Sequence, residues 1–341
     1  MNEKDNYMNE ATKSGQIPSI YIEADSIPEA HYKAIKTVWE QGIRIRTQYD
    51  RKNKAGEFID PPSADMTVTI RINNPWKEPR YPPIFHSEIG AYIAEIMGAK
   101  DHFVVPFETL IDVVKTGKEL TSHEWPYTYH QRLTEYPGVD GKKINQLEVM
   151  LEKIAKDPYT RRAIANTAVP FIDPFLKEDL PCLRELWLRA PEDEKGNIVL
   201  NMNATWRSRD LYKAWPDNMI GLTFLQGYLA RQLQEKMDKP VKTGRYAEIN
   251  ASLHIYGQDF SAVKGDAENG IRSFFDKFKT VDEYINHPGA MTSETARDCL
   301  VVPQLKQLLT PGKIEEWKFG EPQIKLIKGL IDDLESGKYL P

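Results

Sequence analysis

The chain has 341 residues, of which 40% are hydrophobic and 28% charged, and its formal net charge is -5. This composition is ordinary for a globular protein with a sizeable core, and the negative charge argues against a general nucleic-acid binder. Two cysteines are too few for a disulfide scaffold or a zinc cluster, so we expect a reducing compartment. The polar N-terminus lacks the apolar core of a signal peptide, and no stretch approaches the roughly 20 apolar residues that span a membrane. These features predict a cytoplasmic protein.

Apolar residues recur at helical spacing in four segments and alternate in four others, which predicts an α+β fold. The predicted helices cover residues 27–42, 87–98, 144–157 and 218–237, and the predicted strands cover residues 65–73, 182–189, 197–206 and 245–256. The polar stretch APEDEKG separates the second and third strands, which favours an antiparallel pair. We expect a largely antiparallel sheet flanked by helices. The expected organisation is a loose tail at 1–17 and a single domain over 18–341, with a helical extension from about residue 263.

Cys182 follows a proline at the start of a predicted strand, and two interpretations of it are open. A free cysteine is commonly a small apolar filler, whereas its thiolate is a strong nucleophile. The next predicted strand carries a polar face that leads into Arg207 and Ser208. An arginine fork beside a hydroxyl suits a phosphate, and a guanidinium nearby favours a thiolate.

Other polar residues have both a functional and an ordinary structural interpretation. Arg161 and Arg162 follow a predicted helix, where a solvated turn is the alternative to a binding role. His254 and Tyr256 share one side of a strand, where they could hold a sugar hydroxyl or fill the core. Asn218 could present a donor and an acceptor to a pyrimidine edge or cap the long helix.

The sequence predicts neither a metal site nor a common dinucleotide or triphosphate loop. The seven histidines are scattered without a pair at i, i+4, and the two cysteines lack ligand spacing. Cys299 has no motif around it, and we expect it to be filler.

Five short segments occur in an order that resembles the thymidylate synthase superfamily. They are DPYTRRAI, LPCL, RSRD, WPDN and SLHIY. In that family a double arginine precedes the cysteine, and an Arg-Ser-x-Asp motif follows it. An asparagine lies eleven residues after the arginine of that motif, and a His-x-Tyr strand comes last. The segment PYTYHQRL resembles a further motif, with His130 in place of a glycine. The similarity covers roughly residues 28–262.

The resemblance implies one-carbon transfer from 5,10-methylenetetrahydrofolate to C5 of a pyrimidine nucleoside monophosphate. Cys182 would add to C6 of the pyrimidine, and Tyr129 would assist removal of the proton at C5. Arg207 would bind the phosphate of the nucleotide. Glu95 is the implied catalytic glutamate, with Glu88 as the alternative. The other implied substrate ligands are Arg46 (with Arg44 and Arg51 as alternatives), Arg161, Arg162 and Ser208 for the phosphate, Asp210 and Asn218 for the base, and His254 and Tyr256 for the ribose.

The resemblance also implies a homodimer. A sheet face would form the interface, and Arg161 and Arg162 would reach the site of the partner subunit. Neither nucleic acid nor a membrane is an expected partner.

Several departures from the pattern of the methylating enzymes bear on the product of the expected reaction. Leu183 follows the cysteine where those enzymes usually carry histidine, Trp206 stands where they carry glutamine, and the chain ends ESGKYLP, without their short apolar tail. These departures favour the hydroxymethylating branch and the product 5-hydroxymethyl-cytidylate, from CMP or dCMP. Hydroxymethylation of dUMP and true thymidylate synthesis are the alternatives, and Asn218 in WPDNMIGL favours the latter. A catalytically silent nucleotide-binding relative and a cysteine hydrolase are further alternatives, although the hydrolase lacks a histidine placed by motif as its base.

Overall fold

The computed structural model describes residues 10–84, 88–121, 123–139, 141–177, 180–260 and 270–337. These residues divide into two units that interleave along the chain. Within the described ranges, unit 1 contains residues 10–84, 206–219, 247–260 and 270–292, and unit 2 contains residues 88–205, 220–246 and 293–337.

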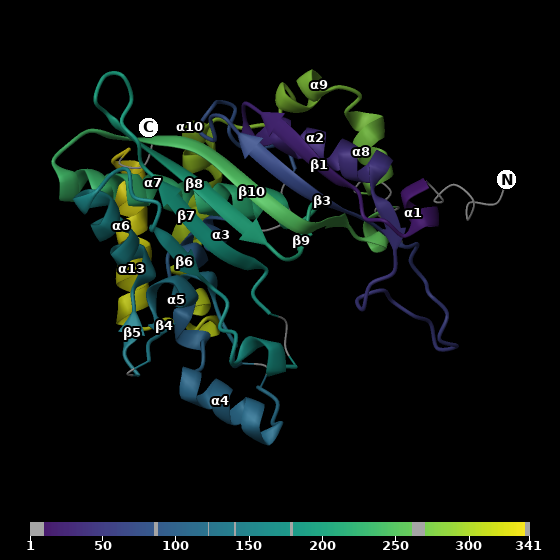
Figure 1. Ribbon diagram of the computed structural model, residues 1–341, viewed down its shortest axis with the longest axis horizontal. Coiled ribbons are helices and arrows are strands. Elements are labelled where there is room, and N and C mark those ends of the chain that lie inside the picture. The colour runs from purple at the N-terminus through teal and green to yellow at the C-terminus, as the bar shows by residue number, and fades with distance from the viewer. Residues whose placement is uncertain are drawn as a thin grey trace. The chain divides into compact units, whose positions relative to one another are not determined.

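Unit 1 is built on paired strands, and helix α2 lies along β1 and β3 (Figure 1). Its strands are β1 (Ser19–Ala24), β2 (Ile43–Ile45), β3 (Ser63–Ile72), β9 (Arg209–Asp210) and residues 247–255 of β10 (Val241–Ile255). Its helices are α1 (Glu10–Ser14), α2 (Ile27–Gln41), the short η4 (Gly257–Asp259), α8 (Ile271–Lys277) and α9 (Val281–Ile285). β1 and β3 are parallel, β2 and β3 antiparallel, and β9 and β10 parallel. Alternate residues of β3 from Met66 to Ile72 are fully buried, which places one face of this strand in the core.

Unit 2 carries the remaining strands and most of the helices. Neighbouring strands follow the order β10, β8, β7, β6, with β6 antiparallel to β7 (Figure 1). The strands are β6 (Ile164–Asn166), β7 (Leu183–Arg189), β8 (Ile198–Trp206), residues 241–246 of β10, and the separate pair β4 (Tyr136–Pro137) and β5 (Lys143–Ile144). The helices are α3 (Ile89–Ile96), η2 (Asp101–Phe103), α4 (Phe107–Thr116), α5 (Tyr129–Thr134), α6 (Gln146–Lys156), η3 (Asp173–Phe175), α7 (Trp215–Met237, whose first five residues belong to unit 1), α10 (Ser293–Ala296), η5 (Arg297–Val301), α11 (Val302–Leu308), α12 (Pro311–Glu316) and α13 (Glu321–Glu335).

Two glycines of unit 2 allow helix α3 to approach its neighbours closely. A Cβ atom at Gly221 of α7 would lie 2.7 Å from the ring of Tyr92 on α3. A Cβ atom at Gly90 of α3 would lie 2.6 Å from the backbone oxygen of Val301. Only glycine fits at such distances. The close packing therefore places α3 directly against α7 and against the backbone at Val301.

The predicted α+β architecture, with a central sheet flanked by helices, is confirmed. The sheet is mixed, because two of the strand pairings described above are parallel. In the segment expected as a loose tail, residues 10–14 form helix α1, and the Thr12 hydroxyl accepts a hydrogen bond from the Arg44 amide (2.9 Å).

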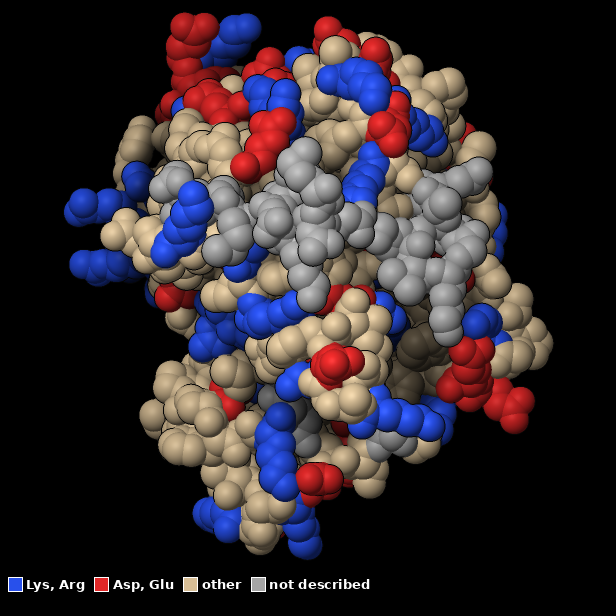
Figure 2. All heavy atoms as spheres, turned by 90° about the vertical axis from the view of Figure 1, so that its right-hand side faces the viewer, with Lys and Arg blue, Asp and Glu red and all other residues tan. Residues whose placement is uncertain are grey.

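The surface charges and the helices of the described residues bear on the possible partners. Acidic and basic side chains are interspersed over the face drawn in Figure 2, in line with the small net charge. No helix among the described residues is long and apolar enough to cross a membrane.

Candidate active site

Hydrogen bonds to the backbone hold the segment around Cys182 in unit 2. The Tyr127 hydroxyl donates to the Leu180 carbonyl (3.3 Å), and the Thr167 hydroxyl donates to the Leu183 carbonyl. Leu183 is fully buried as the first residue of β7, whereas Cys182 is partly exposed. A partly exposed thiol on a fixed backbone suits a nucleophile better than a core filler.

Tyr129 lies near Cys182 in the same unit. It is the first residue of α5, whose N-cap Thr128 accepts a hydrogen bond from the Gln131 amide (3.0 Å). Desolvation, followed by the nearby Cys182 thiolate, raises the pKa of Tyr129 well above its ordinary value. The phenol therefore keeps its proton at neutral pH and acts as a hydrogen-bond donor next to the sulfur.

The two candidate glutamates of α3 have different surroundings. Glu88 is exposed at the N-cap position of the helix. Glu95 is partly buried and pairs with Lys100 (2.8 Å between Oε2 and Nζ), whose ammonium also lies 4.6 Å from the centre of the Trp317 ring. The Glu95 carboxylate thus carries a fixed counter-ion, and both residues stay candidates.

Arg161 and Arg162 are exposed in the turn that follows α6. The turn is closed by the Thr160 amide, which donates to the Asp157 carbonyl (3.0 Å). Within the described residues, neither guanidinium has a protein partner. Both are therefore available to bind an anion or a second subunit.

A buried ion pair organises the segment after β8 in unit 1. Glu248 accepts hydrogen bonds from the Arg209 guanidinium, from Nε1 of Trp215 (2.7 Å) and from Nδ2 of Asn250 (3.0 Å). Nε of Arg209 also donates to Oδ1 of Asn218 (3.3 Å). Asn218 is only 8% exposed, so this bond fixes its amide in a largely dry setting.

Asn218 lies inside α7 and does not cap it. The helix begins at Trp215, and the Asn218 amide donates to the Ala214 carbonyl (3.0 Å) as in an ordinary helical turn. The capping interpretation is therefore wrong.

Arg207 and Ser208 come immediately after β8 and are both partly exposed. Oδ1 of Asp210 accepts from the amides of Tyr212 and Lys213 (both 3.0 Å) and so holds the turn into α7. Burial raises the pKa of Asp210 to about 6. The Arg-Ser segment is thus held between strand β8 and this turn.

His254 ends a hydrogen-bonded relay in unit 1. The Ser252 hydroxyl donates to Oδ2 of Asp65 (2.6 Å), and its oxygen lies 3.2 Å from Nδ1 of His254. Because the hydroxyl proton goes to Asp65, the serine oxygen accepts the proton of Nδ1, which leaves a lone pair on Nε2. His254 is 5% exposed, and its Nε2 has no partner among the described residues. Burial lowers the pKa of His254 to about 4, so a neutral imidazole can accept a bond from a ligand hydroxyl.

Tyr256 stands beside this relay and contributes a second polar group. Its ring lies edge-on to that of His254, with 4.5 Å between ring centres. The predicted pairing of the two residues is therefore present, although His254 is buried and not on an open polar face.

The three arginine candidates, Arg44 in β2 and Arg46 and Arg51 between β2 and β3, are all engaged. Arg51 makes a bidentate ion pair with Asp60 (2.5 and 2.7 Å). Arg46 pairs with Asp50 (3.1 Å) and donates to the Asp60 carbonyl (2.6 Å), and Arg44 donates to a carbonyl of α2 (2.7 Å). Arg51 commits its planar fork to one carboxylate, so Arg46 stays the better phosphate candidate.

Residues 118–325, more than half of the chain, match the thymidylate synthase family. The chain belongs to the thymidylate synthase family. Similar proteins named "putative thymidylate synthase" include those of Methanosarcina barkeri (32% identity, 71% of this chain and 92% of the relative) and Methanothermobacter marburgensis (31%, 73% and 98%). The protein of Methanocaldococcus jannaschii is 28% identical over 71% of this chain and 94% of its own length.

Membership of the thymidylate synthase family sets the general chemistry. The chain is a one-carbon transferase that acts on pyrimidine nucleotides and uses methylenetetrahydrofolate as co-substrate. Among the described residues, no group of three or more histidine, cysteine or acidic side chains is placed to hold a metal ion.

Sequence reasoning missed several residues that support this thymidylate synthase site. Glu248 and Asn250 share the strand parity of buried Tyr246, so their spacing could have predicted buried polar partners. Asp65 gave no such signal, because it lies on the opposite parity from the apolar residues of its strand.

We expect Asp65→Asn to change the pH dependence of stability. Desolvation raises the pKa of Asp65 from 3.8 to about 6, so between these values the folded chain binds more protons than the unfolded chain. The contribution of Asp65 to stability is therefore lost as the pH rises through this window. The free energy of unfolding of the variant, minus that of the wild type, should rise between pH 4 and 7. The rise is at most about 3 kcal/mol, and solvent screening of the carboxylate makes it smaller.

Urea titrations at several pH values would measure this difference. Asp193→Asn is the matched control. The pKa of Asp193 is lowered to about 2 by hydrogen bonds from Asn197, so its difference should change with the opposite sign and at lower pH. A flat difference for Asp65→Asn would contradict the buried relay.

Proposed function

We propose that this enzyme transfers a one-carbon unit to C5 of cytidylate, CMP or dCMP, through a covalent bond between Cys182 and C6, and releases 5-hydroxymethyl-cytidylate. The ordered motif set, with a partly exposed Cys182 beside a protonated Tyr129, is the observation that carries the proposal. A silent nucleotide-binding relative would have no chemical need for this thiol.

The Cys182 thiolate begins the reaction by bonding to C6, and the electron pair of the C5–C6 double bond moves to C5. C5 then bonds to the one-carbon unit, which methylenetetrahydrofolate supplies at the oxidation level of formaldehyde. The C5 proton leaves to water, and the carbon–nitrogen bond to the folate breaks, so tetrahydrofolate departs with the electron pair of that bond and an exocyclic methylene remains at C5. Tyr129 keeps its own proton and orients that water, because its raised pKa makes it a donor and not a base. Water adds to the new exocyclic carbon, and expulsion of the sulfur restores the ring.

Side chains near the ends of β8 and β10 would hold the nucleotide during these steps. Arg207 and Ser208 supply a planar fork and a hydroxyl for the phosphate, with Arg46 as a further ligand. His254 accepts a bond from a ribose hydroxyl at Nε2, the atom that has no protein partner among the described residues. Anchoring the phosphate and ribose keeps C6 close to the sulfur, which is the proximity contribution to catalysis.

Asn218 would read the base, with Asp210 supporting the same side of the ring. Oδ1 of Asn218 accepts from Arg209, and an amide nitrogen in this position could donate to N3 of cytosine or to O4 of uracil. The amide therefore suits both bases, and the choice of cytidylate rests on the residues around the nucleophile.

Two departures from the methylating pattern support hydroxymethylation. Leu183 is fully buried directly after Cys182, where methylating enzymes usually carry histidine. Trp206 is buried under the Arg209 guanidinium, 3.9 Å from its ring centre, where they carry glutamine. Both changes replace a polar side chain next to a key residue with an apolar one.

Methylation of dUMP to dTMP is the second candidate. Hydroxymethylation of dUMP shares its substrate with this candidate and its reaction with the first. The names of the relatives and the presence of Asn218 favour this alternative. Hydride transfer from the folate would then replace addition of water.

The proposed homodimer would use a sheet face of each subunit. In unit 2, Ile164 and Trp187 lie opposite each other on β6 and β7 and are 36% and 49% exposed. Such a cross-strand apolar pair is unusual on a free surface and typical of an interface. Arg161 and Arg162 lie directly before β6, so they would reach the phosphate of the partner subunit.

Mass measurement of the product tests the proposed reaction directly. CMP, dCMP and dUMP are incubated separately with methylenetetrahydrofolate, and each nucleotide is weighed afterwards. We expect a cytidylate to gain one CH2O group without formation of dihydrofolate, which absorbance would detect. Gain of one CH2 by dUMP together with dihydrofolate would establish the second candidate.

Cys182→Ser is the control for this assay. It should lower turnover by at least about a thousandfold while leaving nucleotide affinity within a few-fold, because the lost group is the nucleophile. Unchanged turnover would contradict the covalent step.

Mixed dimers test the sharing of arginines. Cys182→Ala and the double variant Arg161→Ala/Arg162→Ala should each be nearly inactive, and mixing them should restore activity. Random pairing gives half heterodimers, each with one intact site, so about a quarter of wild-type activity is expected. Heterodimers isolated by two affinity tags and found inactive would count against shared sites.

A further inference from the structure

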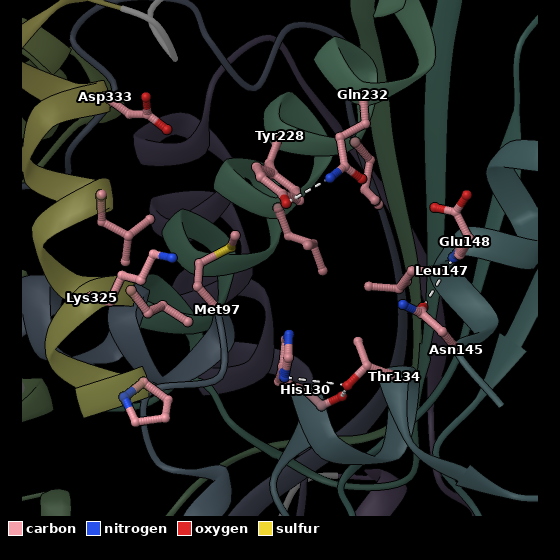
Figure 3. A pocket seen from close by; sticks show the side chains of 16 residues that line it. Met97, His130, Thr134, Asn145, Leu147, Glu148, Tyr228, Gln232, Lys325 and Asp333 are labelled. Atoms are coloured by element: carbon pink, nitrogen blue, oxygen red, sulfur yellow. Dashed lines mark hydrogen bonds between the residues drawn. The ribbon is translucent and has the colours of Figure 1, made fainter. Parts of the chain in front are cut away.

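A cavity of about 660 Å³ in unit 2 plays no part in the proposed reaction. It lies among helices α5, α6, α7 and α13, and its size falls in the range of small-molecule sites (Figure 3). Its apolar lining includes Met97, Leu225, Leu229 and Leu330. A planar, partly apolar ligand would bury its faces against these side chains.

His130 projects into this cavity and is held in one orientation. Its Nδ1 lies 2.5 Å from Oδ2 of Asp101, whose other oxygen accepts from the Thr128 hydroxyl (2.5 Å). Gly98 makes room for the ring, since a Cβ atom there would lie 2.7 Å from it. Figure 3 shows the bond of Thr134 to Nδ1, and the other ring nitrogen, Nε2, faces the hollow. The carboxylate favours the tautomer with a proton on Nδ1, and in that tautomer Nε2 is an acceptor.

Asn145 supplies the complementary donor. Its Oδ1 accepts from the Glu148 amide (3.0 Å) as the N-cap of α6, and its Nδ2 is directed toward the cavity (Figure 3). On another wall, the Tyr228 hydroxyl accepts from Nε2 of Gln232 (2.6 Å). Fixed donors and acceptors around an apolar surface match the edge of a nucleobase, which carries both kinds of group.

The charges of the lining argue against a phosphate. Glu148 and Asp333 contribute two carboxylates, whereas Lys325, exposed on α13, contributes one ammonium. Glu148 is also paired with Lys236 (2.5 Å). With Lys236 counted, these four charges cancel and leave no excess positive charge for a dianionic phosphate, so an uncharged ligand is favoured.

We propose that this cavity binds an uncharged nucleobase or nucleoside as a second site, separate from the nucleotide that reacts at Cys182. His130 and Tyr129 are successive residues of α5, so their side chains point about 100° apart around the helix. Tyr129 lies near Cys182 and His130 lines the cavity, and one short helix therefore borders both sites.

Calorimetric titration of the full-length protein with uridine, cytidine and adenosine tests the proposal. His130→Phe keeps an aromatic ring but removes Nε2, and Asn145→Ser keeps a helix cap but removes the amide donor. Each should weaken binding of the preferred nucleoside by about tenfold, the cost of a lost hydrogen bond in a dry site. Arg207→Ala should weaken binding of the nucleoside monophosphate but leave the nucleoside within twofold, and Lys328→Ala, exposed on α13 outside the lining, should change neither.

Two results would overturn the second site. One is the absence of millimolar or tighter binding by all three nucleosides. The other is binding that weakens with Arg207→Ala and survives His130→Phe and Asn145→Ser, because the nucleoside would then occupy the reaction site. If His130→Phe lowers the melting temperature, Asn145→Ser alone decides. The readout is binding and not turnover, so failure here leaves the product assay unaffected.

Discussion

The buried ion pair between Arg209 and Glu248 is the constraint on which the proposed substrate ligands of unit 1 depend. A charge removed from water must be paired, and breaking such a pair by removing one partner costs about 3–5 kcal/mol. Glu248 satisfies this demand with three donors, and one of them, Arg209, also holds Asn218. Arg209 lies between Ser208 and Asp210 in the chain. Pairing it therefore fixes the backbone that carries the proposed phosphate and base ligands.

Unit 2 uses neutral hydrogen bonds for the same purpose. Tyr127 and Thr167 bind carbonyls on either side of Cys182, so the proposed nucleophile sits on a fixed backbone while its own side chain is partly exposed. Tyr129 is desolvated beside it and keeps its proton. A fixed backbone with an accessible thiol suits the proposed covalent mechanism, because the sulfur must bond to the ring and later leave it without movement of the chain.

Strong periodicity made much of the fold predictable. Helix α2 and strands β3, β7 and β8 occur within a few residues of their expected bounds, because each combines regular apolar spacing with clear end signals. The short strands β1 and β6 were missed, since segments so short carry little pattern. Parallel pairing of β1 with β3 is a long-range choice that local sequence does not encode. The candidate site followed from motif order, but the relay through Asp65 did not, because its partner Ser252 is far away in the chain.

The central claim is that Cys182 bonds to C6 of the pyrimidine before carbon is transferred to C5. A nucleotide with fluorine at C5 tests it most directly, because no proton can then leave C5 and the adduct cannot proceed. Incubation of the enzyme with the 5-fluoro cytidylate or uridylate and methylenetetrahydrofolate, followed by intact-mass and peptide analysis, is the measurement. The account predicts a stable adduct that contains nucleotide and folate on the peptide with Cys182, and none in Cys182→Ser. An unmodified Cys182 with both nucleotides, or an adduct on another residue, would contradict it.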